Sequence, residues 1–218
     1  MKSELPGPWR SLVRFGFRLL YNEMAFTYDS VSWLVSLGDW HSWQRAGIKH
    51  LNVASGARVL ELAHGTANLQ IDLRAAGIDS VGIDFSAAMG RIARRKMIQH
   101  GLVPRLARAR AQALPFPAKT FAAVIATFPT EFIVDPATLD EVHRVLKDAG
   151  RLVIVPNGVL TKGGVAREGL EAAYRVTGQR EAWPARVSER FTAAGFSLTK
   201  VVEPSRIGLA EVLIAEKN

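Results

Sequence analysis

The stretch that decides the fold of this chain is Arg58-Val59-Leu60-Glu61-Leu62-Ala63-His64-Gly65-Thr66-Ala67-Asn68. Its first half is a short apolar run, which is typical of a strand buried on both faces. Small residues dominate its second half, and they let the backbone approach a ligand closely. A second apolar strand ends in Asp84, nineteen residues after Gly65. A small-residue turn after one strand and an acid at the tip of the next predict a doubly wound α/β fold that holds a ribose-bearing cofactor.

From this stretch onward the chain alternates strands and helices. We expect strands at 57–63, 79–84, 105–110, 121–128 and 151–155. We expect helices at 66–76, from Ser86 to 100–101, and from the cap Asp135 and Pro136 to about Lys147, where Gly150 ends the helix. For the last third we predict a loop at 156–164, helices at 165–176 and 185–194, and an antiparallel pair of strands at 197–203 and 207–216.

The first 52 residues predict an N-terminal helical cap, and residues 53–218 a single compact cofactor-binding domain. The cap pattern indicates helices at 9–21, 22–29 and 30–51, the last broken near Gly38-Asp39. The helix at 9–21 is amphipathic and basic, so it is either a lid packed on the domain or a peripheral contact with a membrane surface. Trp33, Trp40 and Trp43 indicate core and cleft wall, or a pocket for an apolar substrate.

Composition and charge limit the classes of function. The chain is 48% apolar, has no cysteine and has no apolar run of the roughly 20 residues that a membrane-spanning helix needs, which fits a soluble cytoplasmic protein. The net charge is +8, and no acid occurs between Asp84 and Glu131. This basic block forms either an ordinary solvated surface or a surface that attracts nucleic acid, anionic lipid or an acidic substrate. Because no aromatic residues interleave with it, no nucleic-acid partner is expected. The histidines lack metal-ligand spacing, so no metal is expected.

The turn itself discriminates between cofactors. A dinucleotide turn has three glycines at positions that here hold Ala63, Gly65 and Asn68, and the Lys-Ser/Thr pair of a P-loop is absent. S-adenosylmethionine carries no phosphate, so it needs the close-approach turn and the ribose acid without a phosphate cradle. The residues therefore favour S-adenosylmethionine.

Four ordered motifs resemble those of class I S-adenosylmethionine-dependent methyltransferases. The stretch from Val59 to Ala67 resembles their V-L-D/E-L-G-x-G-T-G motif, and the stretch from Val81 to Ser86 with Met89 resembles V-G-V-D-x-S-x-x-M. The other two matches are Ala113-Leu114-Pro115-Phe116-Pro117 with Phe121 and Val124, and Asp135-Pro136 with Glu141, Arg144-Val145-Leu146-Lys147 and Gly150-Arg151-Leu152. Upstream, Tyr28-Asp29, Ser36-Leu37-Gly38 and Trp43 are similar to the ubiquinone/menaquinone biosynthesis C-methyltransferases.

The resemblance implies a Rossmann-like seven-stranded sheet in the order 3-2-1-4-5-7-6 with strand seven antiparallel. It implies that Asp84 binds the ribose, that Glu61 organises the methionine end and that Tyr28 closes over it. Arg110, Ala111 and Gln112 would lie by the adenine, and Thr127 and Phe128 next to the sulfonium. The expected cofactor-binding residues are Tyr28, Glu61, Ala63, Gly65, Asp84, Phe85, Met89, Ala111, Gln112 and Thr127.

Departures from the family pattern bear on the chemistry. Ala63 and Ala67 replace glycines and are expected to narrow the space beside the cofactor. Arg110 replaces an acid, so Gln112 or backbone must accept from the adenine amino group. Candidate catalytic residues are Glu131, as a base past strand four, and His64, whose alternative role is that of a hydrogen-bonded structural histidine. The sequence thus predicts a methyltransferase acting on a small apolar or ring-containing acceptor; the alternative is a non-catalytic cofactor-binding or regulatory protein.

Overall fold

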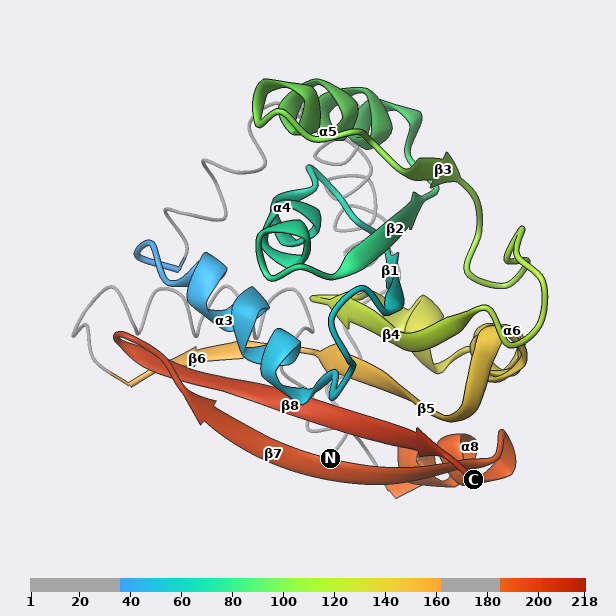
Figure 1. Ribbon diagram of the computed structural model, residues 1–218. Coiled ribbons are helices and arrows are strands. Elements are labelled where there is room, and N and C mark those ends of the chain that lie inside the picture. Colours follow the sequence, from blue (N-terminus) through green and yellow to red (C-terminus); the bar gives the residue numbers. More distant parts are fainter. Residues whose placement is uncertain (1–35, 162–184) are drawn as a thin grey trace, which may run out of the picture.

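The computed structural model describes residues 36–161 and 185–218 (Figure 1). The helices of these residues are α3 (Trp40–Ala46), η2 (Gly47–His50), α4 (Asn68–Ala75), α5 (Ala87–Gln99), η3 (Glu131–Val134), α6 (Pro136–Val145) and α8 (Ala185–Ala193). The strands are β1 (Arg58–Leu62), β2 (Asp79–Asp84), β3 (Leu106–Arg108), β4 (Phe121–Thr127), β5 (Leu146–Val155), β6 (Gly158–Leu160), β7 (Phe196–Pro204) and β8 (Gly208–Lys217). The predicted helices at 9–21, 22–29 and 165–176, the start of 30–51, Tyr28 and Trp33 lie outside the described residues.

The strands form one sheet in the order β3-β2-β1-β4-β5-β8-β6, with β7 paired to β8. Strands β1 to β5 are parallel, and β8 is antiparallel to β5 and β7. The predicted order is confirmed, because β7 and β8 are the sixth and seventh strands of that prediction. The predicted loop at 156–164 is wrong in part, because it contains strand β6. This strand follows β5 and pairs with the same strand β8: Ile154 of β5 lies opposite Leu213, and Gly158 of β6 lies opposite Ala210.

Alternate residues of the central strands supply two separate hydrophobic cores. One face contributes Leu60, Val124 and Leu152, which pack with the buried side chains of α6 and α8. The other face contributes Val59 and Ile125, which pack with α3 and α4. Helices therefore cover both faces of the sheet, as a parallel sheet of continuous apolar strands requires.

The capping predictions are confirmed at the two helix starts that the sequence marks. The hydroxyl of Ser86 accepts from the Met89 amide at 3.2 Å, and a carboxylate oxygen of Asp135 accepts from the Ala137 amide at 3.1 Å. The predicted end of α6 at Lys147 is wrong, because the helix ends two residues earlier and Leu146, fully buried, pairs with Phe121 at the start of β5.

Helix α3, which lies with η2 in the described part of the predicted cap, is anchored in the sheet domain. It begins directly after Asp39, at the predicted break. Trp43 is fully buried, and its indole nitrogen donates to the Ser205 hydroxyl at 3.0 Å. That hydroxyl donates in turn to the buried carboxylate of Asp39 at 2.6 Å. The prediction that Trp43 is a core residue is confirmed.

Candidate functional site

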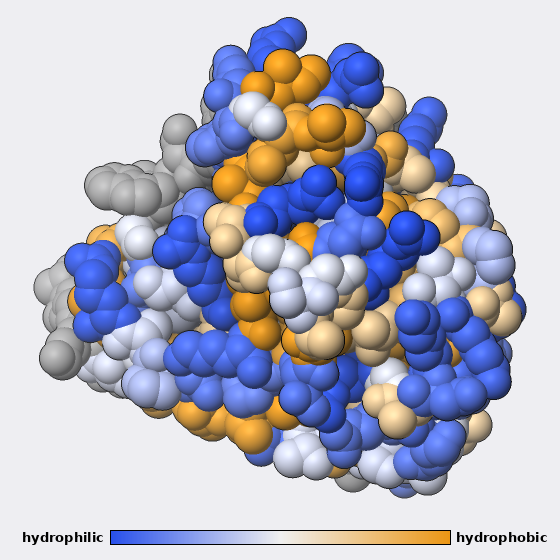
Figure 2. Space-filling view, viewed as in Figure 1, coloured by the Kyte–Doolittle hydropathy of each residue, from blue (hydrophilic) through white to orange (hydrophobic). Residues whose placement is uncertain are grey.

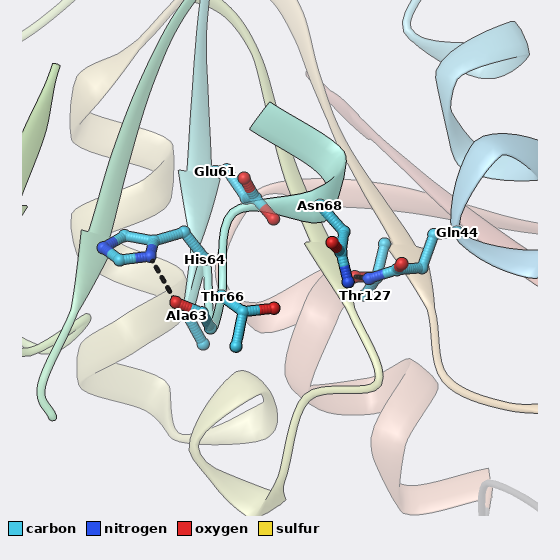
Figure 3. A pocket seen from close by; sticks show the side chains of 8 residues that line it. Gln44, Glu61, Ala63, His64, Thr66, Asn68 and Thr127 are labelled. Carbon is cyan, nitrogen blue, oxygen red and sulfur yellow. Dashed lines mark hydrogen bonds between the residues drawn. The ribbon is translucent and has the colours of Figure 1, made fainter. Parts of the chain in front are cut away.

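Two cavities lie at the carboxyl ends of the central strands and share the residue Ala63. The larger, of about 280 Å³, is lined by Ala63, Ile83, Asp84, Phe85, Ala109, Arg110, Ala111, Gln112 and Phe132. The smaller, of about 20 Å³, is lined by Gln44, Glu61, Ala63, His64, Gly65, Thr66, Asn68 and Thr127 (Figure 3). The edge of a doubly wound sheet where the strand order reverses is the expected place for a ligand, and both cavities lie there.

The turn between β1 and α4 is held in a left-handed conformation at three positions. The φ angles are 56° at Ala63, 53° at Gly65 and 69° at Ala67. Only glycine adopts such angles without a steric penalty, which explains why the family pattern has glycines here. Ala67 is fully buried and packs against Ala93 and Met97 of α5, so it lines neither cavity. The expected narrowing therefore falls on Ala63 alone.

The Asp84 carboxylate ties the turn to the start of α5. One oxygen accepts from the Gly65 amide at 2.9 Å, and the other accepts from the Ser86 amide at 2.7 Å. Each carboxylate oxygen retains a further lone pair, and Asp84 lines the larger cavity, where ribose hydroxyls could donate to it.

Glu61 is buried at the end of β1 in a chain of three side chains. Its carboxyl accepts from the Gln70 amide at 2.7 Å, and the Gln70 oxygen accepts from the Ser80 hydroxyl at 2.8 Å. Burial raises the pKa of Glu61 to about 8, against the opposing effect of the Gln70 hydrogen bond. Without a cation beside it, Glu61 is therefore mostly protonated at neutral pH.

His64 has a structural partner. Its Nδ1 lies 2.9 Å from the Gly65 carbonyl oxygen, which can only accept, so Nδ1 carries the hydrogen. Burial lowers the pKa of His64 against the raising effect of the Asp84 carboxylate. The ring packs over Gly82, where a Cβ atom would lie 3.0 Å from it. Figure 3 shows the ring pointing away from Gln44 and Thr127, so a catalytic role for His64 stays a prediction that this placement does not favour.

The larger cavity has an aromatic and basic wall. The Phe85 ring is 55% exposed, with the guanidinium of Arg110 4.7 Å and that of Arg108 5.5 Å from its centre. Gln112 donates its amide to Asp135 at 3.1 Å. That bond uses one amide hydrogen and leaves the side-chain oxygen as an acceptor, which could serve the adenine amino group of the expected cofactor.

Most of the predicted site residues come together. Asp84, Phe85, Ala111 and Gln112 line the larger cavity, Glu61, Gly65 and Thr127 line the smaller, and Ala63 lines both. Met89 and Glu131 line neither: Met89 is fully buried within the packing of α5, and Glu131 is exposed at the start of η3.

The residues missed at the sequence level are chiefly Gln44, Asn68 and Phe132. The one sequence signal that could have indicated Gln44 is its position directly after Trp43, which belongs to the segment that resembles the C-methyltransferases. Among the described residues, no group of three or more His, Asp or Glu side chains is arranged to hold a metal, and no helix is long and apolar enough to cross a bilayer.

An aromatic pair extends the site beyond the end of β4. Trp40 of α3 stacks on Phe128 with ring centres 3.8 Å apart and planes inclined by 28°. Phe128 follows Thr127 directly and has a φ of 50°, a strained value for a bulky residue. Strained backbone of this kind concentrates at functional sites, so this pair is a candidate wall for a second ligand.

Comparison with known proteins identifies relatives for most of the chain. The sequence profile of the ubiE/COQ5 methyltransferase family matches residues 17–176. A demethylmenaquinone methyltransferase of Thermus thermophilus is 37% identical over 164 residues, which are 74% of this chain and 72% of that protein. The ubiquinone/menaquinone biosynthesis C-methyltransferase UbiE of Geotalea uraniireducens is 33% identical over 142 residues, 62% of this chain and 60% of that protein.

The fold is also found in solved structures. A structure described as an S-adenosylmethionine-dependent methyltransferase, from Thermotoga maritima, superposes with a TM-score of 0.60 over 88% of this chain and 96% of that one. Its sequence identity is 20%, so the likeness concerns the fold.

Proposed function

Because the chain belongs to the ubiE/COQ5 methyltransferase family, we propose that it methylates a ring carbon of an acceptor of the demethylmenaquinone type. The expectation of an S-adenosylmethionine-dependent methyltransferase is confirmed by the family. The acceptor is the proposal: relatives named for demethylmenaquinone and for C-methylation support it.

The donor set of the two cavities fits S-adenosylmethionine. Asp84 would hold the ribose, Phe85 and Gln112 the adenine, and the smaller polar cavity the amino-acid end. The cofactor supplies an activated methyl group when bound. The chain aligns the acceptor with that methyl group and excludes water, which is the protein's main contribution to such a transfer.

The stack of Trp40 on Phe128 is the observation that carries the acceptor class. Both rings are partly buried against the core, and Phe128 directly follows Thr127, which lines the cavity expected for the amino-acid end. An aromatic ring such as a quinol can pack offset or edge-on against these side chains at 4.5–7 Å. Methylation of a ring carbon releases a proton, and Glu131, in the segment after Phe128, stays the candidate base.

The test is a transfer assay with isotopically labelled S-adenosylmethionine and a demethylmenaquinol bearing a short apolar chain. We expect a product heavier by one methyl group, carried on carbon, by mass spectrometry and nuclear magnetic resonance. Phe128→Ala should raise the KM for the acceptor about 10-fold and leave cofactor affinity unchanged. Glu131→Gln should lower kcat about 100-fold if it is the base. Cofactor binding without methylation of this acceptor would refute the proposed acceptor.

A further inference from the structure

We infer that Gln44 is a cofactor-binding residue, whose side-chain oxygen and the Glu61 carboxyl together accept hydrogen bonds from a primary ammonium group. The inference rests on the proposed function, since the amino-acid end of S-adenosylmethionine carries such a group. It concerns the smaller cavity, which Gln44 of α3 and Glu61 of β1 line from different elements (Figure 3).

Glu61 is held in one orientation by the core behind it. The Gln70 side-chain oxygen can only accept, so the Ser80 hydroxyl donates to it. This bond fixes the orientation of the Gln70 amide, whose nitrogen then donates to Glu61. Glu61, Gln70 and Ser80 are each at most 1% exposed, so water does not compete for these bonds. Within the described residues, Glu61 has this one hydrogen-bond donor. It therefore retains acceptor capacity toward the cavity.

Gln44 leaves a second acceptor in the same place. Its amide nitrogen donates to the Thr127 hydroxyl at 3.3 Å, whereas its side-chain oxygen is buried without a partner among the described residues. A buried acceptor left unpaired costs roughly 1–3 kcal/mol, so its natural complement is a donor supplied by a ligand. Two other side-chain acceptors of the cavity already accept one hydrogen bond each: Thr127 from Gln44, and Asn68 from Lys96.

Size and charge select the donor. A volume of about 20 Å³ accommodates one group the size of a water molecule or an ammonium group. The lining contains one acid and no lysine or arginine, and burial lowers the pKa of His64, which disfavours a positive charge there. An ammonium group offers three donors to Glu61 and Gln44, and it would also stabilise the ionised form of Glu61.

The experiment is isothermal titration calorimetry of the full chain with three ligands. S-adenosylhomocysteine carries the ammonium and carboxylate groups, its decarboxylated analogue keeps only the ammonium, and 5′-methylthioadenosine has neither. Gln44→Leu, which keeps the bulk but removes the acceptor, should weaken the first two by 10-fold to 100-fold and change the third less than 2-fold. Gln99→Leu, at the exposed end of α5, is the matched control and should change none.

The outcomes separate this inference from the proposed function. Wild-type protein that binds neither S-adenosylhomocysteine nor methylthioadenosine would refute both. If the wild-type protein binds normally and Gln44→Leu weakens the affinity for all three ligands equally, or for none of them, the role of Gln44 is refuted and the proposed function is not. Gln44→Glu keeps an acceptor oxygen, so it should restore most of the affinity lost in Gln44→Leu. If it does not, or if the effect is lost with the decarboxylated analogue, the ammonium assignment is wrong.

Discussion

The two alanines of the cofactor turn should respond differently to the same substitution by glycine. Ala63 and Ala67 both have left-handed φ angles, 56° and 69°. Ala63 is exposed to the cavities, whereas Ala67 is fully buried against α5. Ala63→Gly and Ala67→Gly therefore relieve similar backbone strain, but only the second removes a packed methyl group.

The expected magnitudes follow from three contributions. A left-handed non-glycine residue costs roughly 1–2 kcal/mol. Replacing alanine by glycine removes this cost. It also destabilises the folded state by about 0.4–1 kcal/mol, because glycine gives the unfolded chain more conformational entropy. Ala63→Gly should therefore raise the free energy of unfolding by roughly 0.5–1 kcal/mol. Ala67→Gly loses in addition about 1 kcal/mol for the buried methyl group and its void, so its net effect should be close to zero.

Urea denaturation followed by circular dichroism measures both variants directly. The difference of about 1 kcal/mol between them corresponds to about 2–4 °C in Tm for a chain of this size. Equal stability of the two variants, or Ala67→Gly as the more stable, would refute the assignment of the Ala67 methyl group to the α5 packing. A loss of stability in Ala63→Gly would refute the strain.

Three further changes test the site and its support. The pKa of Glu61 is raised to about 8 from an ordinary 4.5, so the unfolded chain loses this proton at a lower pH than the folded chain does. The free energy of unfolding of the wild-type protein should therefore fall as pH rises between these values, by up to about 1.4 kcal/mol per pH unit. Glu61→Gln should flatten that slope in urea denaturation from pH 5 to 8, and an unchanged slope would contradict the shift. Gly158→Ala would place a Cβ 2.1 Å from the Trp43 ring and should cost about 3 kcal/mol or more, whereas Gly90→Ala, with open space in α5, should be neutral or stabilising in the same assay. Asp84→Ala should weaken S-adenosylmethionine binding at least 10-fold in calorimetry, and unchanged affinity would show that the ribose contact is misplaced.

Much of the site could be predicted because its signals are local in the chain. The turn after β1, the acid at the end of β2 and the caps Ser86 and Asp135 each depend on a few consecutive residues whose backbone conformation is set by their own chemistry. The end of α6 could not be predicted in this way, because burial of Leu146 against β4 outweighs the helix propensity of Lys147.

The sequence by itself determined the doubly wound topology and the cofactor class, and it identified several residues that line the larger cavity. Periodicity, turn chemistry and motif order are properties of neighbouring residues, and they carry that information. Only the tertiary structure decided that Ala67 faces α5 and Ala63 lines the two cavities, and that Gln44 reaches Thr127 from 83 positions away in the chain. These facts depend on how α3, α4 and α5 pack on the sheet, and contacts between distant residues leave no periodic trace in a single sequence. The sequence of residues 58–68 therefore predicts a cofactor turn, whereas the packing of this turn places Ala63 beside the cavities and Ala67 in the core.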